Sequence, residues 1–118
     1  MARYFTEQEF KDDFDLQRVE TVLNQLYKEE DLLPNSMCSI EFFIMSDKLT
    51  KLEQMEELLE EMGADIDSIE KYEDGCELIA MSQPMLMQVS VVKDWYSNLW
   101  KEGYKLDCKL DGWHILAD

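Results

Sequence analysis

The residues that could carry chemistry in this chain are three cysteines, one histidine and many carboxylates. Cys38, Cys76 and Cys108 are far apart and odd in number, a pattern typical of neither a disulfide framework nor a zinc site with paired ligands. Each lies on the inward face of a predicted strand, so we interpret them as small buried hydrophobes, with a three-thiolate metal site as the alternative. His114 has no neighbour at ligand spacing, which favours a packing or surface role. We predict no catalytic residue, no cofactor and no metal.

The charge of the chain indicates what it binds. Asp and Glu number 27 against 11 Lys and Arg, giving a formal charge of −16 and a sequence pI near 4.2. Such a field repels phosphate backbones and anionic lipids, which disfavours direct binding to nucleic acid or membranes. The glycine-rich nucleotide motifs, the nucleophile elbow and the H-E-x-x-H sequence are absent from the chain. We therefore expect a non-enzymatic protein with a basic protein partner.

The acidic residues concentrate in the middle of the chain. Residues 37–83 hold 13 acidic and 3 basic residues, a net charge of −10. We predict that the outer face of a helix in this segment contacts the partner, and a merely solvated helix face is the alternative. The predicted contact residues on this helix are Glu56, Glu57, Glu60 and Glu61.

The length of 118 residues predicts one domain, with a helical segment over 1–33 and a core over 37–116. The N-terminus has no secretory signal, and no apolar run approaches the roughly 18 residues of a membrane span. The odd cysteine count suits a reducing compartment. We expect a cytoplasmic protein.

The helical segment begins with a capping-box spacing, Thr6 followed by Glu9. An apolar stripe then recurs at three- and four-residue steps through Leu16, Val19, Leu23 and Leu26. We predict a helix whose stripe packs on the far face or the edge of a sheet.

The sequence of residues 37–116 predicts alternating strands and helices. Residues 37–45 read as a nearly buried central strand with Ile40 and Phe42 on one face, and Ser46 or Asp47 caps a helix that Gly63 ends. Residues 66–72 form a polar strand suited to a sheet edge. The Asp-Gly pair at 74–75 predicts a hairpin into a return strand over 76–82.

The last third predicts a helix that begins at Pro84 and ends at Gly103, then a strand in period two over 104–110. The complete order is βαββαβ after an N-terminal helix. This order predicts an α+β fold, a ferredoxin-like βαββαβ sandwich with an additional N-terminal helix.

Two further features could mark a contact surface. Leu110-Asp111-Gly112-Trp113 ends the last predicted strand, where Asp-Gly reverses or bulges the chain. We favour a structural corner for Trp113, with a binding hot spot as the alternative. The eight methionines fall mostly at core spacing, and a Met-rich binding groove is the less favoured interpretation.

Several segments together resemble one family. They are Ser39-Ile40-Glu41-Phe42-Phe43, the acidic helix that ends in Met62-Gly63-Ala64, Tyr72-Glu73-Asp74-Gly75 with its return strand, and the closing Leu110-Asp111-Gly112-Trp113. Across nearly the whole chain this order resembles the regulator of ribonuclease activity B family, small acidic bacterial proteins with a ferredoxin-like fold. The resemblance implies a non-enzymatic inhibitor of ribonuclease E that binds its non-catalytic scaffold region, which is rich in Arg, and so modulates RNA decay.

Two other classes of function remain as alternatives. An acidic immunity or anti-toxin-like protein that neutralises a basic partner fits the charge equally well. A small enzyme or ligand sensor on the same scaffold would need a deep pocket with convergent polar groups.

Overall fold

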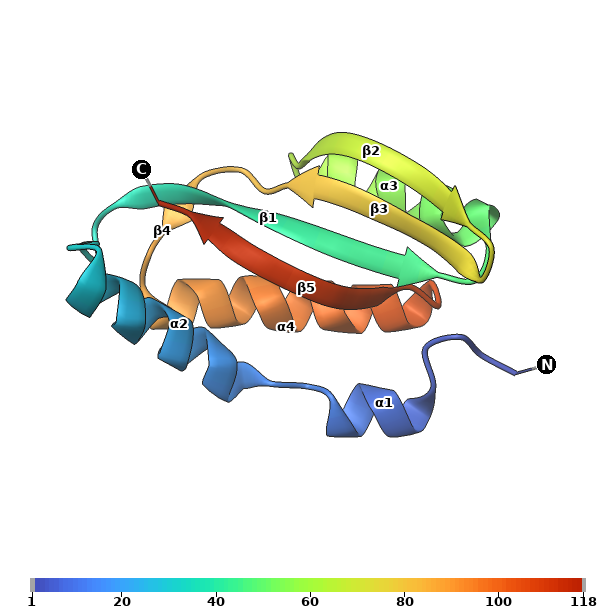
Figure 1. Ribbon diagram of the computed structural model, residues 1–118, viewed down its shortest axis with the longest axis horizontal. Helices are drawn as coiled ribbons and strands as arrows, with labels where there is room; N and C mark the ends of the chain where they lie inside the picture. The colour runs from blue at the N-terminus through green and yellow to red at the C-terminus, as the bar shows by residue number, and fades with distance from the viewer. Residues whose placement is uncertain (1, 118) are drawn as a thin grey trace.

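The computed structural model describes residues 2–117 and has a mixed α/β fold (Figure 1). Four helices accompany one five-stranded antiparallel sheet within these residues. In chain order the elements are α1 (Glu7–Asp12), α2 (Leu16–Glu29), β1 (Met37–Ser46), α3 (Leu49–Glu61), β2 (Asp65–Tyr72), β3 (Gly75–Met81), β4 (Met85–Leu86), α4 (Val89–Lys105) and β5 (Lys109–Leu116).

β1 is the central strand of the sheet. It pairs with β3 along one edge and with β5 along the other, while the short β4 pairs with its first two residues. β2 pairs with β3 and forms an outer edge, as the sequence predicted. The long strands therefore run in the order β2-β3-β1-β5, each antiparallel to its neighbour. The predicted hairpin is confirmed, but its turn lies one residue earlier than the predicted Asp-Gly pair: Glu73 and Asp74 form a two-residue turn, and Gly75 is already paired with Tyr72 at the start of β3.

The N-terminal segment forms two helices where the sequence predicted one. The capping box of Thr6 and Glu9 is confirmed at the start of α1. This helix ends at Asp12, and Asp15 then caps a second helix, α2. The apolar stripe is also confirmed, with Val19 and Leu23 fully buried. The stripe packs against α4 and not on the far face of the sheet, so that part of the prediction is wrong. The far face stays uncovered by α2.

The two faces of β1 differ, which corrects the prediction of a nearly buried strand. Ile40, Phe42 and Ile44 are at most 1% exposed beneath the helices. The alternate residues Phe43 and Met45 are only half-buried and point to the other side of the sheet. Figure 1 looks onto this other side, with α3 behind the ribbon of the sheet. The apolar side chains on both faces of this strand made it resemble one that is buried on both sides.

The start of α3 differs from the prediction. Its N-cap is Lys48, with no side-chain capping bond, because Ser46 and Asp47 are engaged elsewhere. The buried Ser46 hydroxyl donates to the Asp107 carbonyl at 2.8 Å, and Asp47 pairs with Lys51. The predicted end is confirmed: Gly63 follows the helix with φ +84°, a conformation that glycine adopts without strain.

The boundaries of the last helix and strand were predicted wrongly. Pro84 precedes the short strand β4, and α4 begins only at Val89. Gly103 lies inside α4, where a Cβ would stand 2.4 Å from the Cys108 carbonyl oxygen. Gly103 therefore allows the backbone at Cys108 to pass close to α4, and it does not end the helix.

The predicted strand over 104–110 consequently starts too early. β5 begins at Lys109, so the Leu110–Trp113 sequence lies within the strand and not at its end. The predicted irregularity is present, since the register with β1 shifts opposite Asp111. This bulge keeps both Leu110 and Trp113 on the buried face.

Candidate functional site

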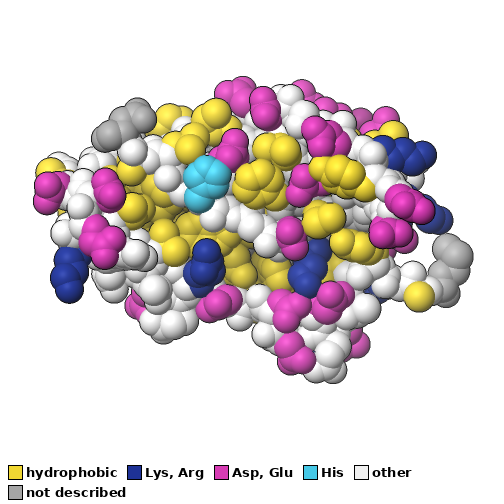
Figure 2. Space-filling model, viewed as in Figure 1, with side chains coloured by type: hydrophobic (Ala, Val, Ile, Leu, Met, Phe, Trp, Pro, Cys, Tyr) yellow, Lys and Arg dark blue, Asp and Glu magenta, His cyan; other side chains and the backbone are white. Residues whose placement is uncertain are grey.

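The face of the sheet that the helices leave uncovered carries the most distinctive arrangement of side chains. We call it the open sheet face and define it by three rows that run across the strands. The first row is Glu70, Glu77, Met45 and Lys109; the second is Ser68, Ile79, Phe43 and Gly112; the third is Asp65, Met81, Glu41 and His114. Figure 2 shows apolar side chains across the middle of this face, interspersed with carboxylates and beside the single histidine.

The middle row is apolar at its centre and small at its ends. Phe43 lies opposite Ile79 on one side and Gly112 on the other, and a Cβ on Gly112 would stand 3.7 Å from the Phe43 ring. The Phe43 ring also lies 6.1 Å from the His114 ring. Two methionines widen this apolar strip, Met81 at 37% exposure and the half-buried Met45.

The outer rows supply negative charge. Glu70 and Glu77 face each other directly across β2 and β3, an arrangement of like charges that weakens strand pairing. The Tyr72 hydroxyl donates to Glu70 at 2.6 Å and to Glu77 at 3.2 Å. These hydrogen bonds and the adjoining negative charges raise the pKa of Tyr72 to about 12, so it stays a neutral donor.

The two basic groups of the outer rows are both engaged. Lys109 donates to Glu9 at 3.0 Å and to Asp13 at 2.7 Å, which ties the edge strand β5 to the segment around α1. His114 Nε2 lies 3.1 Å from Glu41 Oε1.

A hollow continues the open sheet face at the β2–β3 turn. Its volume is about 510 Å³, and its walls include Tyr4, Met45 and Tyr72 together with Glu73 and Asp74. Two tyrosine rings and two carboxylates around one space suit a cation, because the rings attract positive charge over their faces.

The predicted glutamates lie on the side of the molecule that carries α3. Glu57, Glu60 and Glu61 are exposed and Glu56 is half-buried. Glu57 and Glu61 line a shallow hollow of about 350 Å³ between α3 and α4, together with Glu102. None of the four predicted glutamates forms a salt bridge to another residue within 2–117.

Trp113 is 8% exposed and packs beneath α4. Its ring lies 6.3 Å from that of Trp95 and 6.4 Å from that of Tyr96. One edge lines a hollow of about 340 Å³ that also borders Asp111 and Arg18. The structure thus separates Trp113 from the glutamates of α3, which it does not bring into the same site.

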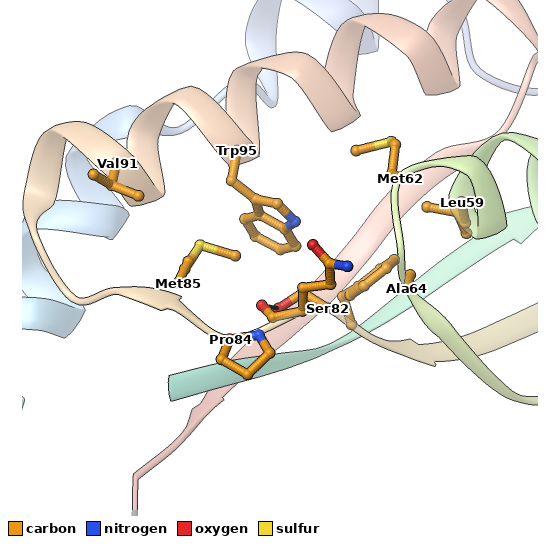
Figure 3. A pocket seen from close by; sticks show the side chains of 10 residues that line it. Leu59, Met62, Ala64, Ser82, Pro84, Met85, Val91 and Trp95 are labelled. Atoms are coloured by element: carbon orange, nitrogen blue, oxygen red, sulfur yellow. Dashed lines mark hydrogen bonds between the residues drawn. The ribbon is translucent and has the colours of Figure 1, made fainter. Parts of the chain in front are cut away.

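An apolar groove lies between the end of α3 and the first half of α4. Its volume is about 250 Å³ and its floor includes Phe42. In Figure 3, Met62, Met85 and Trp95 surround a common space next to Ser82 and Pro84. Met62 and Met85 thus line a groove, the less favoured interpretation of the methionines. It could hold one apolar side chain.

The structure gives the cysteines no reactive environment. Burial raises the pKa of the Cys108 thiol to about 12 and also raises that of Cys76, so both stay protonated near neutral pH. Cys38 lies on the same face of β1 as Ile40 and packs against the core, as predicted, but it is only half-buried. Within residues 2–117 no group of three or more His, Cys, Asp or Glu side chains is placed to hold a metal ion.

Sequence reasoning missed the open sheet face. The signal present in the chain was the Glu41-Phe43-Met45 alternation, which was masked by Phe42 and Ile44 between these residues. The surfaces described above are an acidic helix face, an apolar groove and an acidic-apolar sheet face, each a candidate contact surface on a small acidic α/β protein. No helix among residues 2–117 is long and apolar enough to cross a bilayer.

Comparison with known proteins identifies the family. Residues 16–115 match the family described as regulator of ribonuclease activity B, and the chain therefore belongs to this family. Its members are regulators of ribonuclease E activity rather than enzymes. No match was found among curated proteins. The resemblance stated from the sequence is thus confirmed.

Proposed function

We propose that this protein inhibits ribonuclease E by binding the non-catalytic scaffold region of that enzyme, and so slows RNA decay in the cytoplasm. The observation that carries the proposal is the family match over residues 16–115. The formal charge of −16 supports a cationic, Arg-rich segment as the contact, since opposite charge accelerates and orients association.

Each residue set predicted from the sequence has a role in this proposal. Glu56, Glu57, Glu60 and Glu61 attract the cationic partner at a distance, because they are unpaired within residues 2–117 and mostly exposed. Trp113 contributes indirectly, by fixing β5 against α4. Individual exposed charges contribute little to affinity, so we assign these glutamates to the rate of association.

We further propose that the unit from β1 to β5 is a ferredoxin-like sandwich. The antiparallel order β2-β3-β1-β5 supports this assignment. So does the placement of both helices on one face, where Leu59 of α3 and Trp95 of α4 line the same groove over Phe42. In this fold the opposite face of the sheet is free for a partner.

The test compares full-length ribonuclease E with an enzyme truncated after its catalytic domain, each cleaving the same RNA. We expect this protein to slow the full-length enzyme and to leave the truncated enzyme unaffected. A polyglutamate of matched charge is the control for non-specific attraction.

Equal inhibition of both enzymes would place the contact on the catalytic domain. Inhibition of neither, or equal inhibition by polyglutamate, would contradict the proposal. The family match does not favour the alternative of an immunity protein against a basic toxin.

A further inference from the structure

The open sheet face combines an apolar strip with unneutralised carboxylates. Phe43 and Ile79 form the centre of the strip, and the helices that cover the opposite face of the sheet do not reach it. Figures 1 and 2 show the same side of the molecule, on which no helix overlies β1 and β3. The half-buried Phe43 and Ile79 together with the exposed Met81 make this strip a candidate contact surface.

Negative charge on this face exceeds what the protein itself neutralises. Glu70 and Glu77 receive hydrogen bonds only from Tyr72 within residues 2–117. The basic side chain of the same row, Lys109, is already bound by Glu9 and Asp13 and is turned toward α1. A cation arriving from outside would therefore find acceptors that no internal cation occupies.

The direct opposition of Glu70 and Glu77 strengthens this indication. Like charges facing each other across two strands oppose the pairing of β2 with β3. The cost is relieved when a bound cation lies between the carboxylates. Tyr72 adds a ring at 47% exposure beside this pair, and the Tyr4 ring lines the adjoining hollow.

The chemistry of this face selects arginine over lysine. A guanidinium is planar, donates in two directions to paired carboxylates and stacks on aromatic rings. This face offers paired carboxylates next to aromatic rings. The carboxylates are those of Glu70 and Glu77, and the rings are those of Phe43 and Tyr72. Nucleic acid and anionic lipid are repelled by the same carboxylates.

We infer that the open sheet face docks an extended, arginine-rich segment of the protein partner, with guanidinium groups at Glu70 and Glu77 and the neighbouring side chains on Phe43 and Ile79. This inference rests on the proposed function, because it assigns the surface used for the ribonuclease E scaffold region. Strands lie about 4.8 Å apart, so a segment of roughly six extended residues crosses the four long strands.

The experiment measures association and dissociation rates with two probes. One is the purified scaffold region of ribonuclease E, and the other is a synthetic peptide of roughly ten residues that alternates Arg and Ser, compared with its Lys counterpart. The test variant is Glu70→Lys/Glu77→Lys. The charge-matched control is Glu29→Lys/Glu30→Lys, which makes the same change at the exposed end of α2.

We expect the test variant to dissociate about 10- to 100-fold faster from both probes, whereas the control keeps the wild-type dissociation rate within about twofold. The Arg peptide should bind wild type more tightly than the Lys peptide, and Phe43→Ala should reduce this preference. Equal effects of the test and control variants, or no preference for Arg, would overturn the inference.

A readout on the wild-type protein guards against variants that misfold. Backbone amide resonances of β1 and β3 should shift when the Arg peptide is added, and those of Glu57–Glu61 should not. Shifts confined to α3 would overturn the inference. If the Arg peptide binds the open sheet face but the scaffold region does not bind, the proposed function fails and the surface assignment stands; if neither probe binds, both fail.

Discussion

The carboxylate of Asp107 accepts a hydrogen bond from the backbone N–H of Phe5 at 2.8 Å and thereby joins the two ends of the chain. The same carboxylate accepts the backbone N–H of Tyr4 at 3.0 Å and lies 2.5 Å from Lys51 Nζ. Asp107 adopts φ +60° between α4 and β5, where it is 8% exposed. One buried acid therefore holds the N-terminal segment, the start of α3 and the last strand together.

Removing this carboxylate should destabilise the protein. Asp107→Ala removes the acceptor of two backbone donors and one of the two carboxylate partners of Lys51, and it places alanine at a positive φ, so we expect a loss of about 2–4 kcal/mol in the free energy of unfolding. Asp107→Asn keeps one acceptor oxygen and tolerates the backbone, so its loss should be about half as large. Chemical denaturation measures both variants. Equal stability of Asp107→Ala and wild type would show that the junction contributes nothing.

The same residue predicts a pH dependence. Burial raises the pKa of Asp107, but the hydrogen bonds from Lys51 and from the backbone of Tyr4 and Phe5 outweigh it and hold the pKa below the usual 3.8. A lowered pKa in the folded state contributes stability that is complete above the unfolded value and is lost as pH falls through the folded value. The stability difference between wild type and Asp107→Asn should therefore shrink below about pH 3.8.

The control for this pH series is Asp67→Asn, which removes an exposed carboxylate that has no hydrogen-bond partner within residues 2–117. A change of equal size for Asp67→Asn, or a constant difference for Asp107→Asn, would contradict the assigned role of the junction.

Trp113 should act on stability. Its ring is mostly buried against Trp95 and Tyr96, so Trp113→Ala should cost about 3–5 kcal/mol, and Trp113→Phe distinctly less. Thermal unfolding followed by circular dichroism measures the change. Unchanged stability combined with lost binding of the scaffold region would instead make Trp113 a contact residue.

The glutamates of α3 should act on the rate of association. Reversing Glu56, Glu57, Glu60 and Glu61 to Lys should slow association with the scaffold region about tenfold at low salt and leave dissociation nearly unchanged. The effect should diminish at higher salt, because exposed charges are screened beyond about 10 Å at 0.1 M. Faster dissociation of this variant would show that α3 contacts the partner directly.

Thiol labelling should separate the three cysteines. Cys76 and Cys108 are buried and hold raised pKa values, whereas Cys38 is half-buried at the start of β1. In the native protein we expect a thiol reagent to modify Cys38 first and the other two only after unfolding. The modified residue is identified by mass spectrometry of peptides. Rapid labelling of Cys108 would contradict the packing at the α4–β5 junction.

Local sequence was sufficient for features that depend on neighbours along the chain. The capping box at Thr6 and Glu9, the stop at Gly63 and the presence of a hairpin between β2 and β3 all follow from backbone preferences within a few residues. The stripe through Val19 and Leu23 likewise fixed which face of α2 is buried, because helical periodicity alone decides it.

Features that depend on distant segments required the tertiary structure. Local sequence predicts a helix end at Gly103, yet this residue lies inside α4. It is glycine because the Cys108 backbone passes too close to leave room for a side chain. No local signal indicated which element the apolar stripe of α2 packs against. Because the stripe packs against α4, α2 leaves Phe43 and Ile79 uncovered on the other face of the sheet.

The open sheet face itself arises from strand register. Glu70 and Glu77 are seven positions apart with a turn between them, and a single extra residue at the Asp67 bulge sets how β2 aligns with Ile79 and Met81 of β3. A strand has a side-chain period of two, so this alignment decides which side chains share a face. The sequence by itself determined that the protein is acidic, and the pairing of its strands decided where carboxylates meet an apolar surface.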